Sequence, residues 1–168
     1  MMRGWKLPAL SMAAACLWSA PALAERLEGV LDGKEREWFI LRHEGDSTAT
    51  FTDLGGMHTI DVVGFVDPDS WNSRDSLSIS MTLMDGEVTD YDVLYLIGTS
   101  AMPPLYTSEE ADVRLLLESF DVDGNTARVV GRVEGTLALQ ATLGEEPSLE
   151  EGVDIAVTFD IEASRIEF

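Results

Sequence analysis

The chain has 168 residues, which is enough for one domain with a full hydrophobic core. It carries 31 acidic residues against 11 lysines and arginines, so its formal net charge is −20. A field of this sign repels phosphate backbones and anionic bilayers, which excludes nucleic acid as a partner and favours a soluble over a membrane-embedded protein.

Residues 1–24 have the layout of a secretory signal peptide. Arg3 and Lys6 precede an apolar run, and Ala22-Leu23-Ala24 has the pattern of a cleavage site between small residues. Removal of Arg3 and Lys6 takes the net charge from −20 to −22. We therefore expect an exported protein of residues 25–168, located in the periplasm or outside the cell, with a Gram-negative type of envelope.

The chain has a single cysteine, Cys16, inside the predicted signal peptide. The exported part therefore has no disulfide and must be held together by its core. An alternative localisation is a lipid anchor through Cys16, although Ala13 is a poor match for the residue that usually stands three places before a lipidated cysteine.

Alternation of apolar and polar residues with a period of two dominates residues 25–168. It is clearest in Leu77–Leu83, Ala127–Gln140 and Val153–Glu162, where one face is aliphatic and the other polar. Turn residues such as Asp32-Gly33 and Asp85-Gly86 separate the segments. We expect a single-domain, all-β antiparallel two-sheet sandwich of about nine strands, with a small closed β-barrel as the alternative. The weaker strand segments are Arg26–Leu31, Glu37–Arg42, Ala49–Thr52, Thr59–Val66, Tyr91–Ile97 and Asp112–Phe120.

The longest stretch without strand character is predicted at Met102–Val113. Pro103-Pro104 cannot lie in a central strand, and Ser108–Glu110 is compatible with one helical turn.

The segment Asp121–Asn125 resembles the start of a calcium loop. An EF-hand loop needs glycine at position 6 and a bidentate glutamate at position 12, but these positions hold Thr126 and Arg132. We interpret the segment as a hairpin turn, with a three-residue loop Val122-Asp123-Gly124 and Gly124 in the left-handed conformation. This loop places Leu117 opposite Val129, Val113 opposite Val133, and Glu118 opposite Arg128.

Two glycines, Gly131 and Gly135, interrupt the following strand. We attribute them to a bulge or to a bend over a neighbouring side chain, in preference to the close approach of a ligand.

No pattern predicts catalytic, cofactor-binding or metal-binding residues. His43 and His58 both lie near turns and read as surface histidines, and two isolated imidazoles do not make a zinc site. A Gly-x-Ser-x-Gly elbow is missing, so we expect no enzyme and no cofactor. Trp38 reads as a core residue. Trp71, in a polar loop, reads as a cap on the open end of the sandwich, with a binding anchor as the alternative.

Three features resemble small secreted or lipid-anchored bacterial β-sandwich domains of unknown function. They are Gly29-Val30-Leu31-Asp32-Gly33 followed by Trp38, the segment Val129–Gly135 with its two glycines, and the apolar final strand Val153–Ile161. The resemblance implies fold and export, and it transfers no functional residue.

The predicted function is therefore a non-catalytic binding or envelope-associated interaction module of unknown specificity. Its partner is an unknown protein or a small apolar ligand. The alternative is a small β-barrel that carries an apolar ligand inside, which requires an apolar cavity of several hundred Å³.

Overall fold

The computed structural model describes residues 25–168, so the predicted signal peptide and Cys16 lie outside the described part of the chain. Within that part there are eleven strands and no helix, and consequently no helix that is long and apolar enough to cross a membrane. The strands are β1 (Arg26–Leu31), β2 (Lys34–Phe39), β3 (Arg42–His43), β4 (Asp46–Ser47), β5 (Ala49–Asp53), β6 (Met57–Gly64), β7 (Leu77–Met84), β8 (Glu87–Leu96), β9 (Leu105–Asp123), β10 (Thr126–Gln140) and β11 (Ser148–Arg165).

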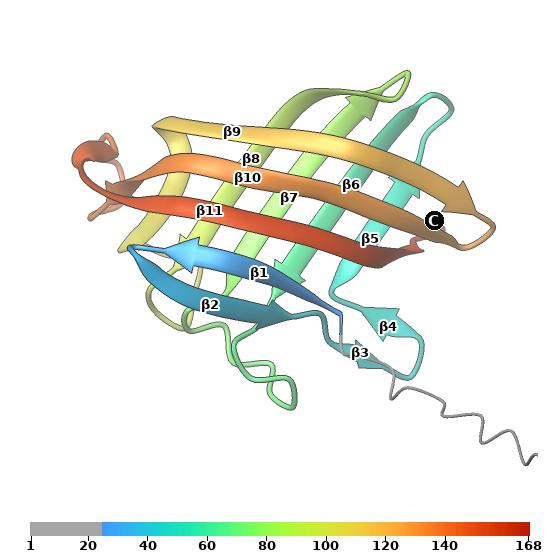
Figure 1. The fold of residues 1–168 in the computed structure, drawn as a ribbon, viewed down its shortest axis with the longest axis horizontal. Coiled ribbons are helices and arrows are strands. Elements are labelled where there is room, and N and C mark those ends of the chain that lie inside the picture. The colour runs from blue at the N-terminus through green and yellow to red at the C-terminus, as the bar shows by residue number, and fades with distance from the viewer. Residues whose placement is uncertain (1–24) are drawn as a thin grey trace, which may run out of the picture.

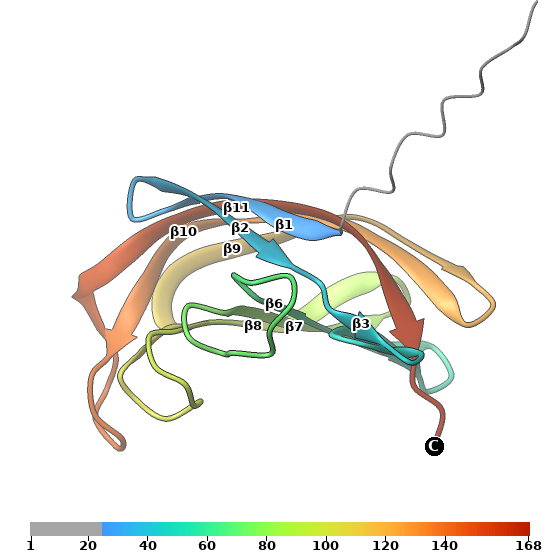
Figure 2. The same cartoon turned by 90° about the horizontal axis from the view of Figure 1, so that it is seen from below.

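The strands form two layers (Figure 1), but these are not the two separate sheets that the sequence analysis predicts. The meander β5–β8 makes one layer, and the long strands β9, β10 and β11 arch across it together with the β1–β2 hairpin (Figure 2). Both layers belong to one sheet with the order β10-β9-β8-β7-β6-β5-β11-β1-β2, and β10 also pairs with β11. The all-β class is therefore confirmed, with layers that are continuous through their hydrogen bonds.

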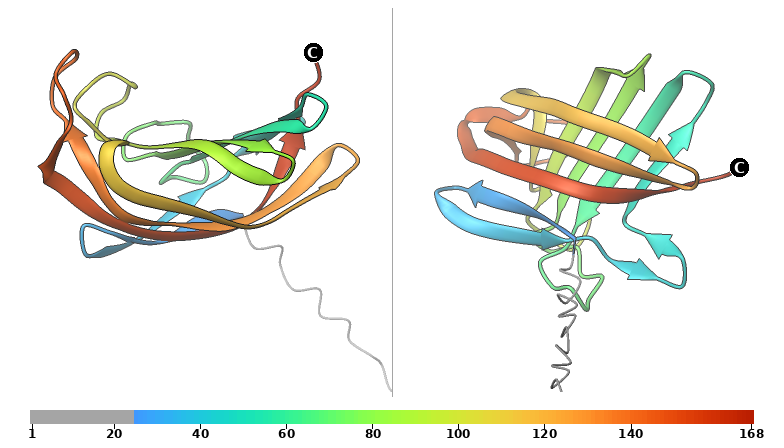
Figure 3. Two further views of the ribbon diagram at one scale, coloured as in Figure 1. Left: turned by 90° about the horizontal axis from the view of Figure 1, so that it is seen from above. Right: turned by 45° about the vertical axis from the view of Figure 1, so that its right-hand side comes forward.

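The layers are joined at two corners by short ladders. Leu94–Leu96 of β8 pairs with Leu105–Thr107 at the start of β9. At the other corner, Ser164 and Arg165 of β11 pair in parallel with Thr50 and Phe51 of β5. Figure 3 shows the long strands curving around the meander between these corners.

The core fills the space between the layers. Leu77, Ile79, Met81 and Leu83 of β7 are all buried, which confirms the apolar face predicted for that strand. They meet Ile155, Val157, Phe159 and Ile161 of β11 in one cluster of buried side chains. Truncation of a buried aliphatic side chain of this size to alanine typically costs about 2–5 kcal/mol.

The prediction that Met102–Val113 lacks strand character is wrong from Leu105 onward, because β9 begins there and includes Ser108–Glu110. Glu110 has a φ of 52°, and the register with β10 shifts between Thr136 and Ala138. A bulge at this point lets the strand bend around the corner instead of ending there. Pro103-Pro104 lies just outside the strand, as predicted.

β9 and β10 form a hairpin joined by a turn, as predicted, but the predicted register of the two strands is wrong. Gly124 has a φ of 61°, so its left-handed conformation is confirmed. The loop has two residues, Gly124-Asn125, because Asp123 pairs with Thr126. Glycine with positive φ at the first loop position is typical of a type II′ turn, which matches the twist of the strands.

A bulge explains why the hydrophobic pattern gave the wrong register. Phe120 lies opposite Val129, but Leu117 lies opposite Gly131, so the ladder slips by one residue next to Glu118. This slip returns the apolar side chains to the core side after a two-residue loop.

The slip also changes the partners of the charged residues. Arg128 faces Asp121 and not Glu118, and its Nε and Nη2 donate to the Asp160 carboxylate of β11 at 2.8 and 2.6 Å. Glu118 lies 3.7 Å from Arg132 instead. The bidentate arginine lowers the pKa of the Asp160 carboxyl.

The interpretation of Gly131 and Gly135 is confirmed. A Cβ at Gly131 would lie 2.7 Å from the Leu116 carbonyl oxygen and 2.8 Å from Cζ of Phe159, so the glycine makes room for the Phe159 ring. Gly135 has a φ of 135° and lies against the backbone of Asp112, at the bend of β10.

We predict that Gly131→Ala lowers the free energy of unfolding by about 1–3 kcal/mol, because the added methyl group overlaps a carbonyl oxygen and an aromatic ring. Gly98→Ala is the control, since nothing lies within 4 Å of a Cβ at Gly98. Urea titration of both variants measures the difference. Equal stability of the two variants would contradict the packing described here.

Candidate binding site

The β1–β2 hairpin forms the flank of the long-strand layer. Its loop residues Asp32 and Gly33 have φ values of 52° and 73°, as a type I′ turn requires of both positions. β1 pairs with β11 on one side and with β2 on the other, so β2 is the last strand of the sheet. Gly29 lets β1 approach β11, because a Cβ there would overlap the Ala156 carbonyl group.

Trp38 fixes β2 to the rest of the protein. Its side chain is completely buried, which confirms the predicted core position. The indole Nε1 donates a hydrogen bond of 2.8 Å to the carbonyl oxygen of Asp75. Gly64 of β6 leaves the space that Trp38 occupies, since a Cβ there would lie 2.5 Å from Cβ of Trp38.

Asp75 closes the loop that follows β6. Its carboxylate accepts a 2.8 Å hydrogen bond from the Tyr95 hydroxyl, and its amide donates to the Leu96 carbonyl. Burial, followed by the Asp75 carboxylate, raises the pKa of Tyr95 to about 12. The same loop carries Val66 and Trp71.

β2 presents an open hydrogen-bonding edge over part of its length. The amide of Phe39 donates to the Phe65 carbonyl at 2.7 Å, and the Phe65 amide donates to the Phe39 carbonyl at 2.9 Å. The backbone N–H and C=O groups of Phe39 therefore point away from β1. In an antiparallel ladder, the backbone groups of the residues two and four positions earlier point in the same direction. The amides and carbonyls of Glu37 and Glu35 therefore face outward, where β2 has no partner strand among residues 25–168.

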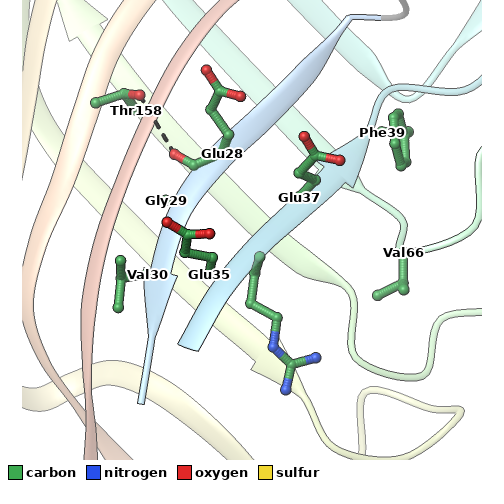
Figure 4. Close-up of a pocket in the computed structure, with 9 residues that line it drawn as sticks. Glu28, Gly29, Val30, Glu35, Glu37, Phe39, Val66 and Thr158 are labelled. Atoms are coloured by element: carbon green, nitrogen blue, oxygen red, sulfur yellow. Dashed lines mark hydrogen bonds between the residues drawn. The ribbon is translucent and has the colours of Figure 1, made fainter. Parts of the chain in front are cut away.

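An open depression of about 730 Å³ lies beside this edge (Figure 4). We call it the β2 depression. Carboxylates from β1 and β2 project around it, and its apolar surface comes from side chains of β1, β2 and the loop after β6 (Figure 4). Its lining residues are Glu28, Gly29, Val30, Glu35, Arg36, Glu37, Phe39, Val66 and Thr158.

The charge of the β2 depression is negative. Arg26 lies 3.0 Å from Glu28 and 3.4 Å from Glu37, and the hydrogen bond to Glu28 together with the Glu37 charge raises the pKa of this arginine. Among the described residues, no cationic group lies within 4.0 Å of the Glu35 carboxylate. Three glutamates thus line this surface together with Arg36, and Arg26 lies beside two of them.

A second depression, of about 390 Å³, continues the same outer face over β11 and β10. It shares Glu28 and Thr158 with the β2 depression and adds residues such as Glu118 and Asp160. Both depressions lie on the solvent side of the long-strand layer, and neither lies between the layers.

The two histidines do not come together. His43 is exposed on β3, as predicted. His58 is not a surface residue: 20% of its side chain is exposed, and its ring lies 5.0 Å from that of Phe120. Its Nδ1 is buried without a hydrogen-bond partner among the described residues. The part of the chain that the structure describes contains no cluster of three or more metal-ligating side chains.

Trp71 packs on a neighbouring aromatic ring, and its role as a binding anchor stays a prediction. Its ring lies 5.9 Å from that of Phe65 and covers this buried residue, while 57% of Trp71 stays exposed. It is the large exposed aromatic side chain of the loop that borders the β2 depression on the side of Val66.

Sequence reasoning missed the β2 depression because the strand predicted there begins too late in the chain. The predicted strand started at Glu37, whereas β2 starts at Lys34. The alternation in Glu35-Arg36-Glu37-Trp38 carried the signal, since it places both glutamates on the face opposite Trp38.

Comparison with protein-family models, curated proteins and solved structures finds no match for this chain.

We predict that the free energy of unfolding falls between about pH 10 and pH 12 through Tyr95. Its pKa is raised to about 12, so the unfolded chain loses this proton first, and the stabilisation is complete only below about pH 10. The Tyr95→Phe variant should lack this part of the decline. Denaturant titrations across this pH range compare the two proteins, and equal slopes would show that burial and the Asp75 contact do not raise the pKa of Tyr95.

Proposed function

We propose that the protein is an exported, non-catalytic binding module of the cell envelope, which uses the β2 depression to bind a cationic segment of a partner protein. The observation that carries the proposal is the coincidence of an open depression with excess carboxylates and an adjoining apolar surface. Its volume lies within the range usual for small-molecule and cofactor sites, about 300–1,000 Å³.

The position of the depression favours a surface partner over a ligand carried inside. The space between the layers is occupied by large, fully buried side chains such as Trp38, Phe51 and Ile60. The two depressions described above lie on the outer face, so a partner there meets the protein without entering its core.

The charge favours a basic partner. The formal net charge of −20 attracts cations over long range and speeds the encounter with a basic protein at low salt. On the outer face of β10, arginines are matched by acidic residues, as in the pairs Arg128–Asp160 and Arg132–Glu118. The glutamates of the β2 depression exceed the arginines near them, so unmatched negative charge is left at this end.

The exposure of the carboxylates supports binding and not catalysis. The side chains of Glu28 and Glu37 are 55% and 53% exposed and lie beside Arg26. A carboxyl group that acts as a general acid is usually kept protonated by burial, and these two carboxyls lack such surroundings.

We predict that a ten-residue peptide of alternating arginine and valine binds the protein at low salt and is released as salt increases. Replacement of Glu28, Glu35 and Glu37 by glutamine should weaken binding roughly tenfold, because each rim charge contributes up to about 1 kcal/mol. Fluorescence anisotropy of the labelled peptide measures the affinity. The protein is prepared from the envelope fraction, where an intact mass beginning at Glu25 checks export.

The matched control removes three acidic charges elsewhere, with Glu87→Gln, Asp90→Asn and Glu109→Gln on β8 and β9. We expect this variant to bind within about twofold of the unmodified protein, as its charges lie outside the β2 depression. Equal loss of affinity in both triple variants would mean that only net charge matters, and the β2 depression would not be the site.

A further inference from the structure

A neighbouring strand could run along the open edge of β2, and one end of that position is already occupied by Phe65. Phe65 occupies the position beside Phe39 and exchanges two backbone hydrogen bonds with it, of 2.7 and 2.9 Å. Beyond Val66 the chain turns away at Asp67-Pro68, so it does not continue along β2. The next positions on this line, opposite Glu37 and Glu35, open into the β2 depression.

These positions offer a regular set of hydrogen-bonding groups. Glu35 and Glu37 each present one amide and one carbonyl outward, in the arrangement that Phe39 uses to bind Phe65. Four backbone groups thus stand at the spacing of an antiparallel strand, and the opposite edge of β2 is fixed by its ladder to β1. An extended peptide added here would gain its affinity from these bonds.

We propose that the cationic partner binds by adding a short antiparallel β-strand to β2 along Glu35–Glu37. This inference rests on the proposed function, and it adds the mode of binding and the sequence that the partner strand requires. Directly opposed residues point their side chains to the same face, so the partner residues opposite Glu35 and Glu37 face these two carboxylates. The partner strand therefore carries arginine or lysine at two positions separated by one residue.

A second copy of this chain is disfavoured as the occupant. Any antiparallel pairing of two β2 strands through these outward groups sets Glu35 or Glu37 against a glutamate of the other copy. Like charges directly opposite each other destabilise a strand pair. The glutamates thus disfavour self-association at this edge and favour a basic partner strand. Charged residues on exposed edge strands generally have this effect.

The test separates the backbone of β2 from its charge. Glu35→Gln removes the carboxylate and keeps the outward amide, whereas Glu35→Pro removes both. Proline is tolerated here because the Glu35 amide does not bind β1 and edge strands accept proline where the amide faces outward. We expect Glu35→Pro to bind the arginine–valine peptide roughly tenfold more weakly than Glu35→Gln, as one hydrogen bond is lost. Thermal melts confirm that both variants are folded.

The reciprocal change is made in the peptide. Methylation of alternate backbone nitrogens keeps every charge and removes the donors of one edge, while methylation of the intervening nitrogens removes those of the other edge. Strand addition predicts that one of the two methylated peptides loses at least tenfold in affinity.

The outcomes are distinguishable. If both methylated peptides bind as well as the parent and the two Glu35 variants are equal, strand addition is overturned, while binding of a cationic segment at the β2 depression stands. If the parent peptide does not bind, or the triple glutamine variant binds it equally well, the proposed function itself fails.

Discussion

The burial of Trp38 is the contact on which the flank of this protein depends. The indole fills the space left by Gly64, and its nitrogen donates a hydrogen bond to the Asp75 carbonyl in the loop after β6. A buried indole contributes a large apolar surface and needs a partner for its single donor, and here one residue of a loop supplies that partner. β2 and the loop after β6 therefore hold one another in place.

That contact explains why β2 is an ordered edge and not a frayed one. Trp38 faces the core, so Glu35 and Glu37, at alternate positions, must face solvent. The Phe39–Phe65 bridge then fixes the end of the strand, and Val66 marks the point where the neighbouring chain leaves. A rigid edge loses little conformational freedom when a partner strand is added, which favours binding.

Much of the fold is visible in the sequence, since residues that alternate with a period of two take a single orientation in a half-buried sheet. Leu77–Leu83 shows this, because its four aliphatic side chains all reach the core. Bulges are less visible: the slip beside Glu118 and the bend at Glu110 each change the register without changing the apolar composition. The hairpin register was therefore wrong although the turn glycine was right.

The candidate site was less accessible to sequence reasoning than the fold. The open edge of β2 depends on the order of strands in the sheet, which places β1 between β11 and β2 and leaves nothing beyond Glu35 among residues 25–168. His58 shows the same limit, since its burial comes from Phe120, 62 residues later in the chain. Both features depend on residues far apart in the chain, so no local residue pattern predicts them.

Amide hydrogen exchange along β2 measures whether its outer edge is open. We predict slow exchange at Arg36 and Trp38, whose amides bind β1, and fast exchange at Glu35 and Glu37, whose amides face solvent. Alternating protection of this kind would establish an ordered strand with one open edge. Protection of Glu35 and Glu37 equal to that of Arg36 and Trp38 would contradict it, because the edge would then already be paired.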